Sequence, residues 1–153
     1  MKFSTRQDIE SPIEAVFDNL SNFDAYERAA LKRGLGVTRR ATAEGEGAWD
    51  LQFPLRGKMR SVIVSLVRLE RPEHLGFAGE SRSFQIEATL TLIALSKART
   101  RMGVELDIRP RTMSGRLLLQ SLRLSKGGYS RKFEAGVQSF ARKIESNRFR
   151  PAG

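Results

Sequence analysis

Hydrophobic and polar residues alternate along most of this chain, and the alternation predicts an antiparallel β-sheet. The clearest segments are residues 84–95 and 98–109, which are joined by a turn at Ser96 and Lys97. Along each segment apolar side chains occupy every second position, with mainly polar or charged side chains between them. This pattern is typical of antiparallel strands that face a core on one side and water on the other.

Five further strands are predicted from the same alternation and from turn residues. They cover residues 3–9, 37–43, 48–53, 58–71 and 75–79. The second and third are joined by Glu-Gly-Glu-Gly at 44–47, a favourable hairpin turn, and Pro72 closes the fourth. The sheet therefore has about seven strands.

A helix follows the first strand almost without a loop. Ser11 and Glu14 have the spacing of a capping box, in which each side chain bonds the other residue's backbone amide, and Pro12 suits the first helical position. The apolar face of this helix comprises Ile13, Val16, Phe17 and Leu20. A second short helix follows a capping segment at 21–26, runs through Leu31 and stops at one of the glycines beyond it.

The C-terminal part of the chain carries a helical stripe. Its members are Leu118, Leu122, Tyr129, Phe133, Val137, Phe140 and Ile144. The stripe keeps its phase across Gly127 and Gly128, which predicts one long helix over 118–144 with a weak point at the glycines. The alternative is a plain break there, since glycine pairs often end helices.

Composition indicates one globular domain over residues 1–150. The chain has 153 residues, 40% of them hydrophobic and 29% charged, and no cysteine. Disulfides, thiolate metal sites and a cysteine nucleophile are thereby excluded. No apolar run approaches the ~20 residues that span a bilayer. The first residues lack the apolar stretch of a secretory signal, so we expect a cytoplasmic protein.

The net charge of +10 lies entirely in the C-terminal part. Residues 1–96 carry 13 basic and 13 acidic side chains, whereas residues 97–153 carry 14 basic and four acidic ones. Such asymmetry favours an anionic partner, although it also suits a solvated surface. The basic residues on or near the last helix are Arg116, Arg123, Lys126, Arg131, Lys132, Arg142, Lys143 and Arg148.

The element order and two segments resemble the START-like superfamily. The order is one strand, two short helices, about six strands and a long amphipathic helix. The segments are Ile-Glu-Ser-Pro-Ile-Glu-Ala-Val-Phe at 9–17 and Leu-Glu-Arg-Pro-Glu-His-Leu-Gly-Phe at 69–77. The chain is similar to the polyketide cyclase/dehydrase and lipid-transport group, to coenzyme Q-binding proteins and to the G-type subunits of carbon-monoxide dehydrogenase. The resemblance implies an α+β helix-grip fold with a cavity for a hydrophobic or amphipathic molecule, and it carries over no catalytic residue.

Strand parity identifies a candidate cavity wall. On residues 58–71 one set of alternate positions is charged, which assigns the other set, from Ser61 to Leu69, to the interior. The candidate wall comprises Trp49, Leu51, Phe53, Ser61, Ile63, Ser65, Phe77, Ile86, Leu90, Met102, Val104, Leu106, Tyr129 and Phe133. Thr5 and Gln7 would add polar points. The alternative is that these side chains fill a core and leave no cavity.

Little in the sequence points to catalysis or to a cofactor. The single histidine, His74, lies in a predicted turn and suits an exposed or capping role better than that of a general base. No spacing of ligands predicts a metal site, and no glycine-rich phosphate loop follows a strand. We therefore expect no metal and no cofactor.

Three functions fit these observations. The first is binding of a lipid, a quinone or a polyketide-like molecule in the cavity, and the second is a cyclase or dehydratase that uses the same cavity. The third is contact with an anionic membrane or polyanion through the basic C-terminal half. Nucleic acid suits this surface less well because the aromatic side chains lie on the buried stripe. A second apolar set, Val62, Val64, Leu66, Ile93 and Leu95, indicates either a surface for homodimer formation, burial under a loop, or a bulge that shifts the parity.

Overall fold

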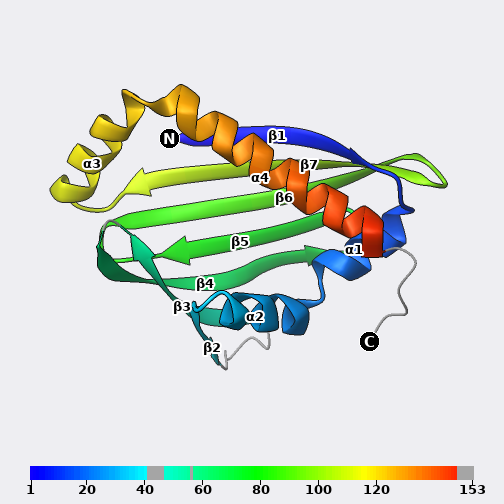
Figure 1. Cartoon of the computed structure of the whole chain (residues 1–153), viewed down its shortest axis with the longest axis horizontal. Coiled ribbons are helices and arrows are strands. Elements are labelled where there is room, and N and C mark those ends of the chain that lie inside the picture. The colour runs from blue at the N-terminus through cyan, green and yellow to red at the C-terminus, as the bar shows by residue number, and fades with distance from the viewer. Residues whose placement is uncertain (41–46, 56, 148–153) are drawn as a thin grey trace.

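The computed structural model describes residues 1–40, 47–55 and 57–147. Within these residues, seven antiparallel strands form one sheet in the order β1-β7-β6-β5-β4-β3-β2 (Figure 1). The strands are β1 (Lys2–Ile9), β2 (Gly36–Arg40), β3 (Ala48–Leu55), β4 (Lys58–Glu70), β5 (His74–Glu80), β6 (Phe84–Ser96) and β7 (Arg99–Pro110). The helices are α1 (Ile13–Leu20), α2 (Phe23–Lys32), α3 (Met113–Arg123) and α4 (Lys126–Asn147). The predicted turn at 44–47 lies mostly outside the described residues.

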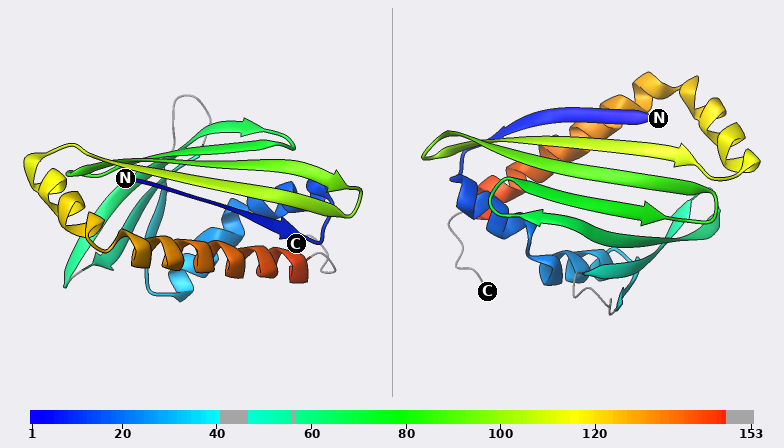
Figure 2. Two further views of the ribbon diagram at one scale, coloured as in Figure 1. Left: turned by 90° about the horizontal axis from the view of Figure 1, so that it is seen from above. Right: turned by 180° about the vertical axis from the view of Figure 1, so that it is seen from behind.

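The sheet curves around α4, as the helix-grip prediction requires. Helices α1, α2 and α4 lie against the same face of the sheet, which we call the inner face (Figure 2). The predicted alternation of β6 and β7 is confirmed, because Met102 and Leu92 face each other across the two strands and both are buried. Among the helices of the described segments, none is long and apolar enough to cross a membrane.

The parity predicted for β4 is wrong. Cross-strand partners share a face, and Val62 and Val64 pair with Leu51 and Trp49 of the inner face. Val62 and Leu66 are buried, whereas Ile63 and Val67 are exposed on the opposite face. A register shift between Leu66 and Arg68 then reverses the parity, so the bulge named among the alternatives above is present.

The long C-terminal helix of the predicted fold is present as α4, but the prediction of one uninterrupted helix over 118–144 is wrong, because α3 and α4 are separate, as the alternative of a break proposed. The break falls at Leu124 and Ser125, two residues before the glycine pair, and both glycines lie in the first turn of α4. The stripe does not continue through the break, since α3 buries Gly115 and Leu119 whereas the stripe residues Leu118 and Leu122 are half-buried. Phe133 of α4 stacks on Phe3 of β1 with ring centroids 5.7 Å apart.

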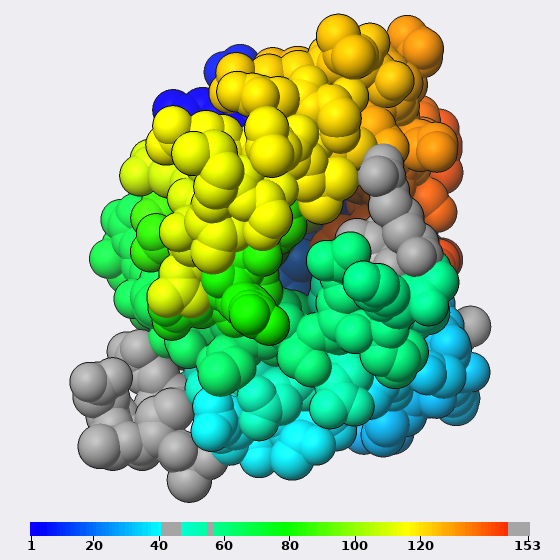
Figure 3. All heavy atoms as spheres, turned by 90° about the vertical axis from the view of Figure 1, so that its left-hand side faces the viewer, coloured from blue at the N-terminus to red at the C-terminus, as the bar shows by residue number. Residues whose placement is uncertain are grey.

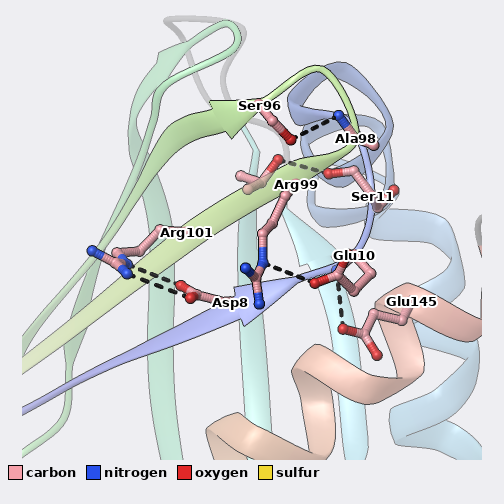
Figure 4. Close-up of polar contacts among 9 residues, drawn as sticks. Asp8, Glu10, Ser11, Ser96, Ala98, Arg99, Arg101 and Glu145 are labelled. Carbon is pink, nitrogen blue, oxygen red and sulfur yellow. Dashed lines mark hydrogen bonds and ion pairs between the residues drawn. The ribbon is translucent and has the colours of Figure 1, made fainter.

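The turn between β1 and α1 is held by tertiary contacts and not by the predicted capping box. No side chain caps α1 at Pro12, and the Glu14 carboxylate pairs with Arg71. Ser11 is only 1% exposed, and its carbonyl accepts a hydrogen bond of 2.8 Å from Thr100 Oγ1 of β7 (Figure 4).

The neighbouring residue ties this turn to the last helix. The backbone amide of Glu10 donates to Glu145 Oε1 of α4 at 3.0 Å, and the Glu10 carboxylate pairs with Arg99 at 2.8 Å (Figure 4). The turn at Glu10 and Ser11 therefore links three parts of the fold: the first strand, the β6–β7 hairpin and α4.

Candidate functional site

A cavity of about 360 Å³ lies between the sheet, α2 and α4. Its lining is almost entirely apolar. The lining residues are Leu20, Phe23, Tyr26, Glu27, Ala30, Val37, Trp49, Leu51, Val64, Leu75, Phe77, Leu90 and Phe140. A volume of this size lies within the range of small-molecule sites, ~300–1,000 Å³.

Helix α2 supplies one wall of the cavity. Phe23, Tyr26, Glu27 and Ala30 recur at helical spacing, so they share the side of α2 that faces the sheet. The helix begins where Asn22 Oδ1 accepts a hydrogen bond from the Ala25 amide. It ends before Gly34, whose φ of +79° is a left-handed conformation that glycine adopts without strain.

Aromatic rings form the part of the wall between α2 and the sheet. The rings of Phe23 and Trp49 are 5.2 Å apart, and those of Phe23 and Phe77 are 6.3 Å apart in an edge-to-face arrangement. On the α4 side, the Tyr26 ring lies 5.8 Å from that of Phe140. Ring contacts of this kind stabilise the wall and present flat apolar surfaces to a ligand.

One carboxylate interrupts the apolar wall. Glu27 Oε1 accepts a hydrogen bond of 2.6 Å from the indole Nε1 of Trp49 and another of 2.6 Å from Nε of Arg39. The Arg39 guanidinium also bonds Asp24 and lies 5.9 Å from the centre of the Trp49 ring. Glu27 is the one charged residue of the lining within the described part of the chain, and the network fixes both its carboxylate and the indole.

Tyr26 links the cavity wall to α1. Its hydroxyl donates to Asn19 Oδ1 at 3.1 Å. Burial between α2 and α4 disfavours the phenolate and raises the pKa of Tyr26 to about 12. The side chain is therefore neutral at physiological pH, and its hydroxyl serves as a hydrogen-bonding group.

The sequence-predicted wall residues fall into three groups. Trp49, Leu51, Phe77 and Leu90 line the cavity. The second group lies on the inner face or on α4 but not in this lining: Phe53, Ile86, Met102, Val104, Leu106, Tyr129 and Phe133. The third group, Ser61, Ile63 and Ser65, faces away from the helices, because the parity of β4 is opposite to the prediction.

Sequence reasoning missed the α2 wall and the inner residues of β4. The spacing of Phe23, Tyr26 and Ala30 was a usable signal, since it places three side chains on one side of a short helix. Val64 was missed because residues of both parities on β4 are apolar. In the second apolar set, for which a surface patch was one of three alternatives, Val62 and Leu66 are buried, whereas Ile93 and Leu95 are exposed.

Arg60 also lies on the inner face, contrary to the prediction for it. It pairs with Phe53 across β3 and β4, and its side chain is half-buried. Its Nε is buried and finds no hydrogen-bond partner among the described residues. The Arg60 side chain therefore carries one hydrogen-bond donor that no described residue uses.

His74 is not part of the cavity wall. It begins β5, opposite Glu70 and Thr91, and its Nδ1 has no partner within the part of the chain that the structure describes. No cluster of three metal-ligating side chains occurs in that part either.

The molecule is hollowed at the end where α3 lies. Viewed from that end, a hollow opens between α3 and the β3–β4 region, and its floor shows the colours of α1 and α4 (Figure 3). Leu20 of α1 and Phe140 of α4 also line the cavity. Strand β4 begins at the same end of the sheet (Figure 1), and Arg60 is its third residue.

Comparison with known proteins identifies the fold. No protein-family model matches the chain, and no curated protein matches its sequence. Among solved structures, the aromatase/cyclase Zhui from Streptomyces sp. R1128 matches with a TM-score of 0.70 at 12% identity, covering 100% of this chain and 98% of that one.

Two other solved structures agree with this match. A protein from Thermus thermophilus gives a TM-score of 0.65 at 15% identity over 97% of both chains. A START superfamily protein from Mycobacterium smegmatis gives 0.57 at 16% identity over 86% of this chain and 95% of that one. The chain therefore has the helix-grip fold of the START-like superfamily.

Proposed function

We propose that the cavity binds a hydrophobic or amphipathic small molecule that contains flat rings, such as a quinone or a polyketide-like aromatic compound. The observation that carries this proposal is the wall itself, in which Phe23, Trp49 and Phe77 surround an apolar space of about 360 Å³. Contacts between a planar ligand and these rings would add ~0.5–1.5 kcal/mol per pair to the effect of apolar burial.

Two polar groups suit an amphipathic ligand. Glu27 can accept a hydrogen bond from a ligand hydroxyl at the α2 end, and its charge disfavours a ligand carboxylate there. Arg60 offers a cation near the end where the hollow opens. A fatty acid, the lipid alternative, would have to direct its carboxylate toward Arg60. Cyclase or dehydratase activity, which would need a charged group in the wall, stays a hypothesis for which Glu27 is the candidate.

The test uses the fluorescence of Trp49, the only tryptophan of the chain. We expect 1,4-naphthoquinone to quench it saturably, because the indole lines the cavity. The absence of cysteine excludes quinone addition to a thiol. Ala30→Phe fills the cavity and should weaken binding at least about tenfold. Ala29→Phe changes an exposed position of the same helix and should leave the affinity within about twofold.

Quenching that does not saturate, or that is equally strong in Ala30→Phe and in the parent protein, would contradict the proposal. Competition with palmitate distinguishes the ligand classes. Displacement of the quinone by palmitate at equal concentration would contradict the preference for rings, and failure to displace it would support that preference. Thermal melting of each variant establishes that it is folded.

A further inference from the structure

We propose that α3 docks this protein on an anionic lipid bilayer, an inference that goes beyond ligand binding in the cavity. Helix α3 buries one side and exposes a second apolar side. Gly115 and Leu119 are buried toward the fold. The opposite side presents Met113, Leu117 and Leu124 at the helix end, with exposed fractions of 67%, 58% and 90%. A helix on a water-facing surface normally has a polar outer side, so this one is suited to an apolar environment.

Basic residues surround the inner edge of the same helix. A pocket of about 590 Å³, which we call the basic pocket, lies between α3, the start of β1 and the end of β7. Five basic residues line it: Lys2, Arg109, Arg116, Arg123 and Lys126. Among the described residues of this lining, Asp107 is the one acidic side chain, and it is already bonded to Arg109 at 2.9 Å. The four other cations form no ion pair with any described residue, so the basic pocket has a surplus of positive charge.

The combination of these two features selects a bilayer as the partner. Exposed leucine and methionine can enter the boundary between headgroups and acyl chains, while the neighbouring cations bind the anionic headgroups. A nucleic acid would use the cations but gain nothing from the aliphatic side chains, and α3 has no aromatic residue on which a base could stack. A second copy of this basic surface would repel the first.

The position of α3 gives this docking a consequence. The helix projects at one end of the sheet (Figure 1) and borders the hollow that opens there (Figure 3). Insertion of its apolar side would hold that opening near the lipid surface. A hydrophobic ligand could then pass between bilayer and cavity with little exposure to water.

The experiment is cosedimentation of the full chain with vesicles of phosphatidylcholine alone or with about 30% phosphatidylserine. We expect binding to the anionic vesicles only, and less of it as NaCl rises from about 0.1 to about 0.5 M. Each cation near an anionic surface contributes ~1 kcal/mol, so Arg116→Gln with Arg123→Gln should weaken partitioning about 30-fold. Leu117→Ser with Leu124→Ser should weaken it at least about tenfold.

Matched variants at other exposed sites control for general effects. Arg142→Gln with Lys143→Gln removes two exposed charges near the far end of α4, and Ile93→Ser with Leu95→Ser removes two exposed apolar side chains at the end of β6. Both should change partitioning less than about threefold. Equal binding to neutral vesicles, or equal loss in the control pairs, would overturn the proposal. So would saturable binding of an RNA oligonucleotide without vesicle binding. Quenching of Trp49 by the quinone is measured without lipid, so it tests the cavity proposal independently of membrane docking.

Discussion

At the scale of single residues, Ser11 and Thr100 show how tertiary contacts replace a local motif. The sequence around Ser11 predicts a cap, but the residue is buried and its Oγ has no hydrogen-bond partner among the described residues. The bond that holds the turn comes from Thr100, which lies 89 positions away in the chain. Capping motifs describe neighbours in sequence only, so they could not reveal this partner.

Removal of the hydroxyl group should therefore affect the free energy of unfolding differently at the two residues. Thr100→Val leaves the buried Ser11 carbonyl without its donor and should lower the free energy of unfolding by ~1–3 kcal/mol. Ser11→Ala removes a buried hydroxyl that bonds nothing described, so stability should change by less than ~0.5 kcal/mol or rise. Urea unfolding of both variants measures this. A loss of ~1 kcal/mol or more in Ser11→Ala would instead support the capping role.

At the scale of elements, the sequence predicts a strand from the alternation within it, but it does not predict a strand's inner face where that face depends on neighbouring elements. The strands at 84–95 and 98–109 were found nearly to the residue because only one parity of each is mainly apolar. On β4 both parities carry β-branched or aliphatic residues, so the face that Val62 and Val64 occupy depends on Trp49 and the helices behind it. On α2 the spacing of Phe23, Tyr26 and Ala30 did indicate a common side, but not that this side faces a cavity.

The separation of α3 from α4 is another element-scale feature, and Gly115 tests how α3 is seated. A Cβ added at Gly115 would lie 2.5 Å from the carbonyl oxygen of Ser83, in the turn between β5 and β6. Gly115→Ala should therefore displace α3 and lower stability by ~1–3 kcal/mol, measured by urea unfolding. Gly136→Ala on α4, where a Cβ meets nothing within 4 Å, should raise stability by ~0.5–1 kcal/mol. Equal stabilisation by both substitutions would show that α3 is not seated by this contact.

At the scale of the whole molecule, Tyr26 joins three parts of the fold that enclose the cavity. It lies on α2, stacks on Phe140 of α4 and bonds Asn19 of α1. Burial at this junction raises its pKa from 10.0 to about 12, whereas the unfolded chain ionises near the ordinary value. Between these values the folded state binds the proton that the unfolded state has lost, so stability falls as pH rises through that window.

The pH dependence of unfolding should therefore report on the closed cavity wall. Stability contributed by the neutral phenol is fully present below pH 10 and should decrease by about 1 kcal/mol by pH 11. Tyr26→Phe should flatten this decline in urea unfolding, even if its stability at neutral pH is lower. Tyr129→Phe, at a position 36% exposed on α4, should keep the decline of the parent protein. If stability declines as steeply with pH in Tyr26→Phe as in the parent protein, the α2–α4 junction is open to water. The ligand site beside α2 would then be hydrated. Contacts between aromatic rings could not select its ligand there.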